Sequence, residues 1–150
     1  MAMISVIVDA RRGAEALPVL LAQLTTGAVD GLVRQVLLVA EPGQAGIDLL
    51  CEETGADAHL SLEAAAAVAR ASWLIAAPAE FRLRDGWIKA IEGHLAGGGK
   101  AAIVQGLDRG SVFRRPTTAV LVERGRLEGR HGADLDGLRR ELGLRPARVG

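Results

Sequence analysis

Short apolar runs alternate along the chain with stretches in which leucine and alanine recur at helical spacing. Four runs are apolar at every position except Ser5, which is typical of strands buried on both faces. They are Ile4–Val8, Val36–Val39, Trp73–Ala77 and Ala101–Val104. Continuous strands separated by amphipathic helices indicate βαβ units. The pattern therefore predicts an α/β fold with a mainly parallel sheet and helices on both faces.

The stretches between these runs predict the helices. Four leucines from Leu17 to Leu24 lie at i, i+3, i+4 and i+7, and Gly27 is placed to stop that helix. Further helices are expected over Ile47–Cys51 (ending at Gly55), the alanine run Ala64–Ala69, Ile88–Leu95 and Leu135–Leu142. Beyond Gly106 arginine becomes frequent around one short apolar run, Ala119–Val122. We expect one domain over 1–150, with a first part over 1–105 and a reduced C-terminal part over 106–150.

Composition excludes several classes of protein. Lys and Arg total 18 and Asp and Glu total 18, and aromatic residues make up 3% of the chain. A nucleic-acid binder normally has a basic surplus, so no nucleic acid is expected as a partner. A single cysteine, Cys51, can form neither an internal disulfide nor a cysteine-based zinc site. No start resembling a signal peptide and no apolar run of about 18 residues is found, which favours a cytoplasmic protein without a transmembrane segment.

Familiar nucleotide and metal motifs are missing. The turn after the first strand, Asp9–Gly13, lacks the G-x-G-x-x-G spacing of dinucleotide sites. The glycine-rich loop Gly97–Lys100 follows a helix and enters a strand. A phosphate-binding loop instead follows a strand and places its amides at the start of a helix, so Gly97–Lys100 does not match one. The three histidines, His59, His94 and His131, fall at unrelated spacings and do not indicate a metal site.

Two stretches together resemble the family-2 glycosyltransferases, which have the GT-A fold. Ile4–Arg11 followed by Glu15–Leu21 is similar to the strand, Pro-x-Arg-Asn-Glu turn and leucine-rich helix that open the family. Ala69–Leu74, continuing through Pro78–Leu83 to Gly86 and Trp87, is similar to the strand with the Asp-x-Asp metal motif and its Thr-Arg-Leu-Pro-Pro-Gly-Trp continuation. The likeness runs in register from Ile4 to about Leu95 and becomes patchy beyond it.

The resemblance implies a site for a nucleotide-diphosphate sugar. Val36–Val39 occupies the place of the strand that ends on a ribose-binding aspartate, and Ala133–Asp136 resembles the Glu-Asp motif that holds the catalytic base. By this likeness the nucleotide-sugar site includes Asp9, Ala10, Arg11 and Glu41, the metal ligand for Mg²⁺ or Mn²⁺ is Glu80, and the base is Asp134.

Four positions depart from the family pattern, and the chain is short between metal motif and base motif. Pro78 takes the first acidic position of the metal motif, Ala40 the ribose aspartate, Arg12-Gly13 the Asn-Glu of the turn, and Ala133 the glutamate beside the base. The expected function is therefore a glycosyltransferase-like protein of weak or absent activity, with any Mn²⁺ affinity weak and dependent on nucleotide. The alternative is a non-catalytic GT-A-fold module for binding or assembly. The Leu-Ala-Gly-Gly sequence of Leu95–Gly98 resembles a loop of the related nucleotidyltransferases. That family places the loop after its first strand, whereas here it lies far downstream, so a nucleotidyltransferase is disfavoured.

Structural roles remain open for most of these residues. Glu80 can be a solvated carboxylate at a strand end, Asp134 can cap the last helix, and Trp87 is expected to pack against the sheet. Arg11 and Arg12 can equally belong to a solvated turn.

The segment Gly106–Gly132 has little apolar surface with which to cover the sheet, so we expect it to contribute to a homodimer interface.

Overall fold

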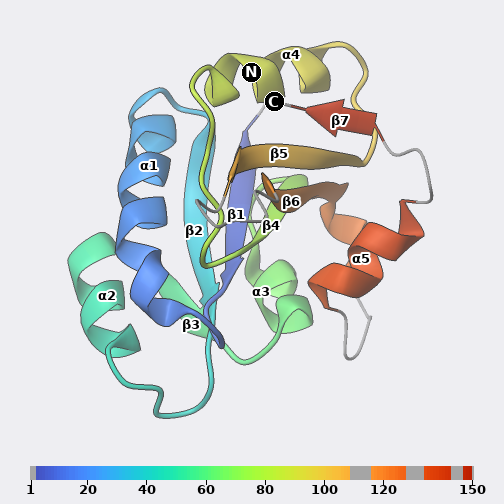
Figure 1. The fold of residues 1–150 in the computed structure, drawn as a ribbon. Helices are drawn as coiled ribbons and strands as arrows, with labels where there is room; N and C mark the ends of the chain where they lie inside the picture. Colours follow the sequence, from blue (N-terminus) through green and yellow to red (C-terminus); the bar gives the residue numbers. More distant parts are fainter. Residues whose placement is uncertain (1–2, 109–115, 128–133, 143–146, 150) are drawn as a thin grey trace.

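The computed structural model of the chain describes residues 3–108, 116–127, 134–142 and 147–149. In this part of the chain one mixed sheet has seven strands in the order β3-β2-β1-β4-β6-β5-β7 (Figure 1). The strands are β1 (Ile4–Asp9), β2 (Val33–Val39), β3 (Asp57–His59), β4 (Trp73–Pro78), β5 (Ala102–Asp108), β6 (Pro116–Glu123) and β7 (Ala147–Val149). Every pairing is parallel except those of β6, which runs antiparallel to β4 and β5. The predicted α/β class with a mainly parallel sheet is confirmed.

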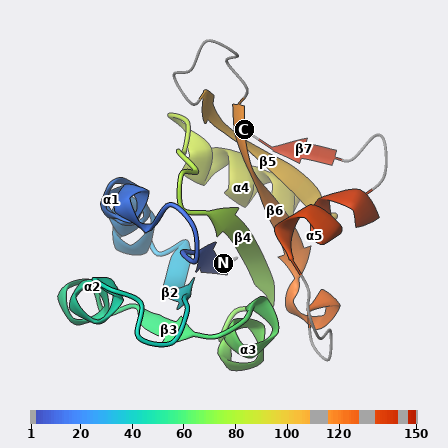
Figure 2. The same ribbon diagram turned by 60° about the horizontal axis from the view of Figure 1, so that its bottom comes forward.

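Helices cover both faces of the sheet, as Figure 2 shows. They are α1 (Leu17–Val29), α2 (Ile47–Thr54), α3 (Leu62–Val68), α4 (Trp87–Ala96) and α5 (Leu135–Glu141), with short 3₁₀ turns at Ala14–Ala16 and Arg124–Arg126. The buried residues of α1, α2 and α4 join one apolar cluster, and those of α3 and α5 join a second. The sheet lies between these two clusters.

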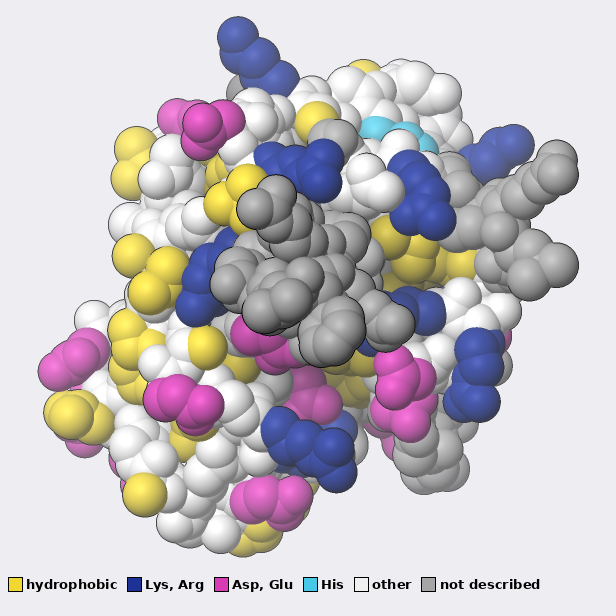
Figure 3. Space-filling model, viewed as in Figure 1, with side chains coloured by type: hydrophobic (Ala, Val, Ile, Leu, Met, Phe, Trp, Pro, Cys, Tyr) yellow, Lys and Arg dark blue, Asp and Glu magenta, His cyan; other side chains and the backbone are white. Residues whose placement is uncertain are grey.

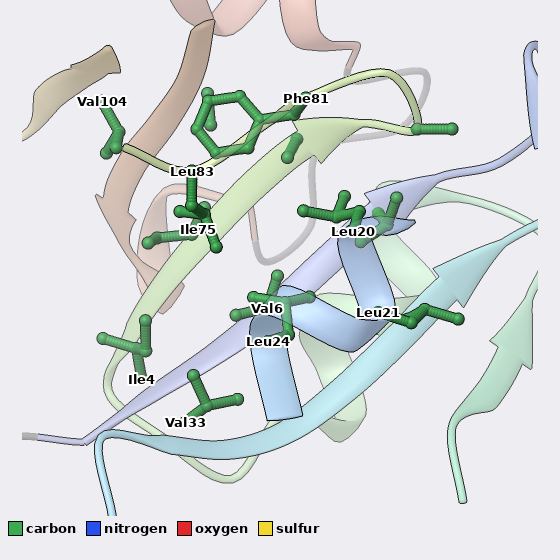
Figure 4. Packing of buried hydrophobic residues seen from close by; sticks show 14 of the residues in the cluster. Ile4, Val6, Leu20, Leu21, Leu24, Val33, Ile75, Phe81, Leu83 and Val104 are labelled. Atoms are coloured by element: carbon green, nitrogen blue, oxygen red, sulfur yellow. The ribbon is translucent and has the colours of Figure 1, made fainter. Parts of the chain in front are cut away.

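Strand β1 shows why consecutive residues of the central strands are mostly apolar. Val6 and Val8 point into the first cluster, whereas Ile7 belongs to the second. Figure 4 shows the first cluster, where Leu24 of α1 lies beside Val6. Alternate side chains of a strand point to opposite faces, and both faces are buried here. Ser5 is the one polar residue of β1 before the strand end, and it is buried as well.

The expected stop at Gly27 is wrong, because α1 continues to Val29. Gly27 is instead a point of close packing. A β-carbon at this position would collide with the Trp87 ring and lie 2.7 Å from Val33 Cγ2. Trp87 therefore packs against α1, and glycine is needed there for space and not as a helix terminator.

Other sequence predictions hold or need small corrections. α2 ends as expected at Gly55, which has φ +76°. Strands β3 and β7 were not predicted, since each has only three residues. Gly106, where the composition changes, lies inside β5, so the strands on either side of it belong to one sheet.

Of the predicted interface segment, residues 109–115 and 128–132 lie outside the described residues. Within the described ranges, no helix has the length and apolarity that crossing a membrane would need.

Candidate functional site

The carboxyl ends of β1, β2 and β4 meet at one edge of the sheet. Asp9, the last residue of β1, lies between Val39 of β2 and Pro78 of β4 in the strand register. Open α/β sheets bind ligands outside the carboxyl ends of their parallel strands. Figure 3 shows basic and acidic side chains next to one another in the lower part of the view, where these strands end.

Asp9 and Arg11 form a two-point ion pair within the turn after β1. Arg11 Nη2 donates to Asp9 Oδ2 at 2.8 Å, and Arg11 Nε donates to Asp9 Oδ1 at 3.0 Å. The Arg11 backbone N–H donates to the same Oδ1 at 3.2 Å. Burial alone would raise the pKa of Asp9, but the hydrogen bonds from Arg11 and the charges of Arg11 and Arg12 hold it below its ordinary value. The pair fixes one guanidinium at the strand end.

Arg11 brings together predicted site residues that are far apart in the sequence. Its pKa is raised by the hydrogen bond to Asp9, against the effect of burial, and further by the charges of Asp9, Glu41 and Asp134. Glu41 follows β2 and Asp134 precedes α5, and the charges of both act on this guanidinium.

Gln44 ties the loops after β1 and β2 to each other. Its Nε2 donates to the Ala10 carbonyl at 2.7 Å, and its Oε1 accepts from the Glu41 backbone N–H at 2.9 Å. The Ala10 backbone N–H in turn donates to the Val39 carbonyl at 2.8 Å. Sequence reasoning missed Gln44, because the family pattern places an aspartate, and not an amide, near this strand end.

A hollow of about 180 Å³ adjoins these loops. Its lining includes Glu41, Gln44, Asp48, His59 and Leu60. His59 Nε2 is buried and has no hydrogen-bond partner in the structure. A buried polar atom without a partner marks a place where water or a ligand is accommodated. The sequence did not point to His59, because the spacing of the three histidines bears only on metal binding.

The described residues do not fit a divalent-cation site built from protein ligands alone. Glu80 follows β4, and its Oε2 lies 3.9 Å from where a β-carbon on Gly13 would be. Pro78 supplies no ligand atom at the other position of the motif, and Glu80 already has a polar interaction. Across the described ranges no three His, Cys, Asp or Glu residues are grouped so as to hold a metal ion. Mg²⁺ bound by so few carboxylates depends on the phosphates of a substrate.

Asp134 is the N-cap of α5, as one of the two sequence hypotheses expected. Its Oδ1 accepts from the Gly137 backbone N–H at 2.6 Å, and the residue is exposed. Capping occupies one carboxylate oxygen, and the base role stays a prediction. Ala133, the other half of the predicted base motif, lies outside the described residues.

Comparisons with known proteins agree with this geometry at the level of fold. The chain superposes on a 4-diphosphocytidyl-2C-methyl-D-erythritol synthase with a TM-score of 0.62 and 14% identity, over 99% of this chain and 88% of the other. The same enzyme from Anaerococcus prevotii gives a TM-score of 0.59 and 13% identity, with the same coverage of 99% and 88%. The chain therefore shares the α/β fold of these synthases.

A further match is the mannosyl-3-phosphoglycerate synthase of Rubrobacter xylanophilus. Its TM-score is 0.54 at 14% identity, over 69% of this chain and 39% of that protein. This chain therefore spans well under half of that synthase. By sequence, the chain matches no protein-family model and no curated protein. Identities this low establish a shared fold and leave the activity to be argued from the site.

Proposed function

We propose that the protein binds a nucleotide-diphosphate sugar at the carboxyl ends of β1, β2 and β4 and, like the family-2 glycosyltransferases it resembles, transfers the sugar slowly to a hydroxyl acceptor. The observation that carries the proposal is the Arg11 guanidinium, held by Asp9 at the strand end beside two loops that Gln44 joins. The Arg11 N–H groups that do not donate to Asp9 are held in place by this pair and can donate to the oxygens of a diphosphate.

The nucleobase belongs in the hollow beside Glu41 and His59. Its volume, about 180 Å³, suits a single planar ring system and not a whole ligand. Glu41 and His59 both line this hollow and so lie beside a base placed there. The ribose then lies near the Gln44-linked loops, which leads the diphosphate toward Arg11.

Arg11 and Arg12 are the cationic groups for the diphosphate. Arg12 is exposed next to the Asp9–Arg11 pair, close enough for its charge to lower the pKa of Asp9. Both guanidinium groups can donate hydrogen bonds to the oxygens of a diphosphate.

Transfer requires one proton to move and two bonds to exchange. The acceptor oxygen bonds to the anomeric carbon of the sugar while its proton passes to the Asp134 carboxylate. The bond between the anomeric carbon and the diphosphate oxygen breaks, and the nucleoside diphosphate leaves with the electron pair. Arg11 and Arg12 stabilise the charge that develops on this leaving group.

A non-catalytic nucleotide-binding module is the second candidate. It is favoured by the capping role of Asp134 and by Pro78, which removes a carboxylate from the metal motif. Both candidates keep the same nucleotide site, so they differ only in whether Asp134 takes a proton. That difference can be tested without disturbing the helix.

Asp134→Asn separates the two candidates, because asparagine caps helices as well as aspartate does but cannot act as the base. If the protein transfers sugar, we expect this variant to keep its melting temperature and to lose about 100-fold or more in transfer rate. The measurement is release of nucleoside diphosphate from nucleotide-diphosphate sugars with alcohol acceptors.

Asp136→Asn is the control, since Asp136 lies in the same helix turn and pairs at 3.0 Å with Arg139. No turnover by the unaltered protein, together with intact nucleotide binding, would establish the non-catalytic candidate. Equal transfer rates in both variants would remove Asp134 from the mechanism.

A further inference from the structure

The segment between β4 and α4, residues 79–86, is fastened to the body of the fold. Its side chains Phe81 and Leu83 are buried in the first apolar cluster (Figure 4). The Gln23 side chain of α1 donates to the Leu83 carbonyl at 3.2 Å and accepts from the Leu83 N–H at 2.9 Å. The backbone of the segment also forms hydrogen bonds with β5 and with a side chain of β6. The segment is therefore a fixed support at the end of the sheet where β4 finishes.

Arg82 connects this support to the turn after β1. Its Nη2 donates to the Ala16 carbonyl at 2.9 Å, while its Nη1 donates to the carbonyls of Ala79 at 3.2 Å and Phe81 at 2.7 Å. Ala79 and Phe81 belong to the same segment as Arg82, whereas Ala16 lies 66 positions away in the sequence. One planar guanidinium thus bonds to carbonyl groups of two separate segments.

A short series of contacts leads from Ala16 to the proposed diphosphate site. The Ala16 N–H donates to the Gly13 carbonyl at 2.9 Å and so closes the 3₁₀ turn. Gly13 has φ +70° and directly follows Arg12. Glu80, from the segment after β4, has its Oε2 3.9 Å from where a β-carbon on Gly13 would be. The two segments therefore meet at two points, and the arginines before Gly13 are attached directly to the turn that the guanidinium holds.

The hydrogen bonds of Arg82 depend on the shape of its side chain more than on its charge. In the described part of the chain, Arg82 forms no ion pair with a carboxylate. The three carbonyl groups that it bonds are neutral, and the residue is half-buried. A lysine ammonium has the same charge but lacks the planar set of donors that reaches acceptors on two sides. Bridging the two segments therefore requires a guanidinium.

We propose that Arg82 is a positioning residue of the nucleotide site, because its bond to Ala16 holds the turn that carries the two arginines for the diphosphate. This role rests on the proposed nucleotide function. Arg82 acts through the turn and not by contact with the nucleotide. Gln44 links the loops after β1 and β2, and Arg82 links the turn after β1 to the segment after β4. Two side chains thus join the three loops at this end of the sheet.

Arg82→Ala and Arg82→Lys are compared with Arg84→Ala, which is the control. Arg84 lies in the same segment and has the same charge, but its Nε donates to the Gly106 carbonyl of β5 at 2.9 Å and not to the turn after β1. Amide hydrogen exchange is measured on the nucleotide-free proteins. We expect exchange at Ala16 to be about fivefold faster in both Arg82 variants, the size of one lost hydrogen bond, and unchanged in Arg84→Ala.

Calorimetric titration with UDP and CDP then measures the effect on the site. We expect both Arg82 variants to bind about fivefold more weakly than the unaltered protein and Arg84→Ala to bind within about twofold of it. A general loss of stability would not separate the variants in this way, and melting temperatures report that loss independently. Should Arg82→Ala not fold, Arg82→Lys provides the same comparison.

Three results would overturn the positioning role. They are unchanged exchange at Ala16 in the Arg82 variants, nucleotide binding by these variants as tight as by Arg84→Ala, and recovery of both readouts in Arg82→Lys, which would assign the effect to charge. Failure of the unaltered protein to bind UDP and CDP would contradict the proposed function instead. Exchange at Ala16, which needs no nucleotide, would then decide whether Arg82 holds the turn.

Discussion

Replacing Gly106 by alanine should lower the free energy of unfolding by about 3 kcal/mol, because a methyl group there has no space. A β-carbon on Gly106 would collide with the Arg82 carbonyl oxygen and with Thr117 Oγ1, and it would lie 2.8 Å from Phe81 Cε2. Two of these three groups belong to the segment that follows β4. Neither carbonyl nor hydroxyl can withdraw freely, since both take part in hydrogen bonds.

Those hydrogen bonds fasten the segment after β4 to the later strands. The Leu107 backbone N–H donates to the Arg82 carbonyl at 2.8 Å, and the Arg82 N–H donates to Thr117 Oγ1 at 3.2 Å. The Thr117 hydroxyl donates in turn to the Leu107 carbonyl at 2.9 Å. Thr117 is 1% exposed, so any bond broken by the methyl group leaves a buried polar atom without a partner.

Two other glycines serve as controls in the same denaturant titrations. Gly125→Ala meets no atom within 4 Å and should change the stability by less than about 0.5 kcal/mol. Gly93→Ala, also unobstructed and inside α4, should raise the stability by about 0.5 to 1 kcal/mol through helix propensity. A Gly106→Ala protein as stable as Gly125→Ala would mean that β5, β6 and the segment after β4 do not meet as described.

Arg11→Ala should weaken the binding of nucleoside diphosphates about 50-fold, or about 2 to 3 kcal/mol, the size of a lost charge-assisted hydrogen bond. The substitution removes a phosphate partner. It also leaves the Asp9 carboxylate without its two side-chain hydrogen bonds from Arg11, facing the incoming phosphates. Both effects act in the same direction, so the loss should exceed that of any other single arginine at this end of the sheet.

Arg34→Ala is the matched control, because it removes the same charge from an exposed position near the amino end of β2. Calorimetric titration with UDP and CDP compares the two variants with the unaltered protein. We expect Arg34→Ala to retain affinity within about twofold, since exposed charges more than a Debye length away are screened. Equal losses in the two variants would show that only net charge matters and that the Asp9–Arg11 pair has no specific role.

The sequence predicted the parts of the fold that depend on burial. The buried residues of β1, β2 and β4 are apolar on both faces of the sheet. Any α/β sheet covered by helices on both faces produces this pattern in the sequence. It did not reveal β3, whose residues Asp57 to His59 are too few and too polar to show a period. Gly27 was misinterpreted because a glycine that makes room for Trp87 looks, in sequence, like one that ends a helix.

The candidate site was predicted in outline but not in its contacts. Asp9, Arg11 and Glu41 follow strand ends, so their grouping could be expected from the topology alone. Gln44 and His59 could not, because their roles rest on a side-chain bridge and on a buried nitrogen that only coordinates reveal. A polar residue shortly after a strand end is the one signal in the sequence that points toward Gln44.

Amide chemical-shift mapping tests most directly whether a nucleoside diphosphate binds at the carboxyl ends of β1 and β2. UDP and CDP are titrated into the ¹⁵N-labelled protein. We expect saturable shifts in the turn Asp9–Gly13, in the loop Glu41–Gln44 and at His59 and Leu60, with none at Lys100 or Arg126 at the other end of the sheet. Shifts concentrated at Lys100 and Arg126, or no saturable shifts at all, would contradict it.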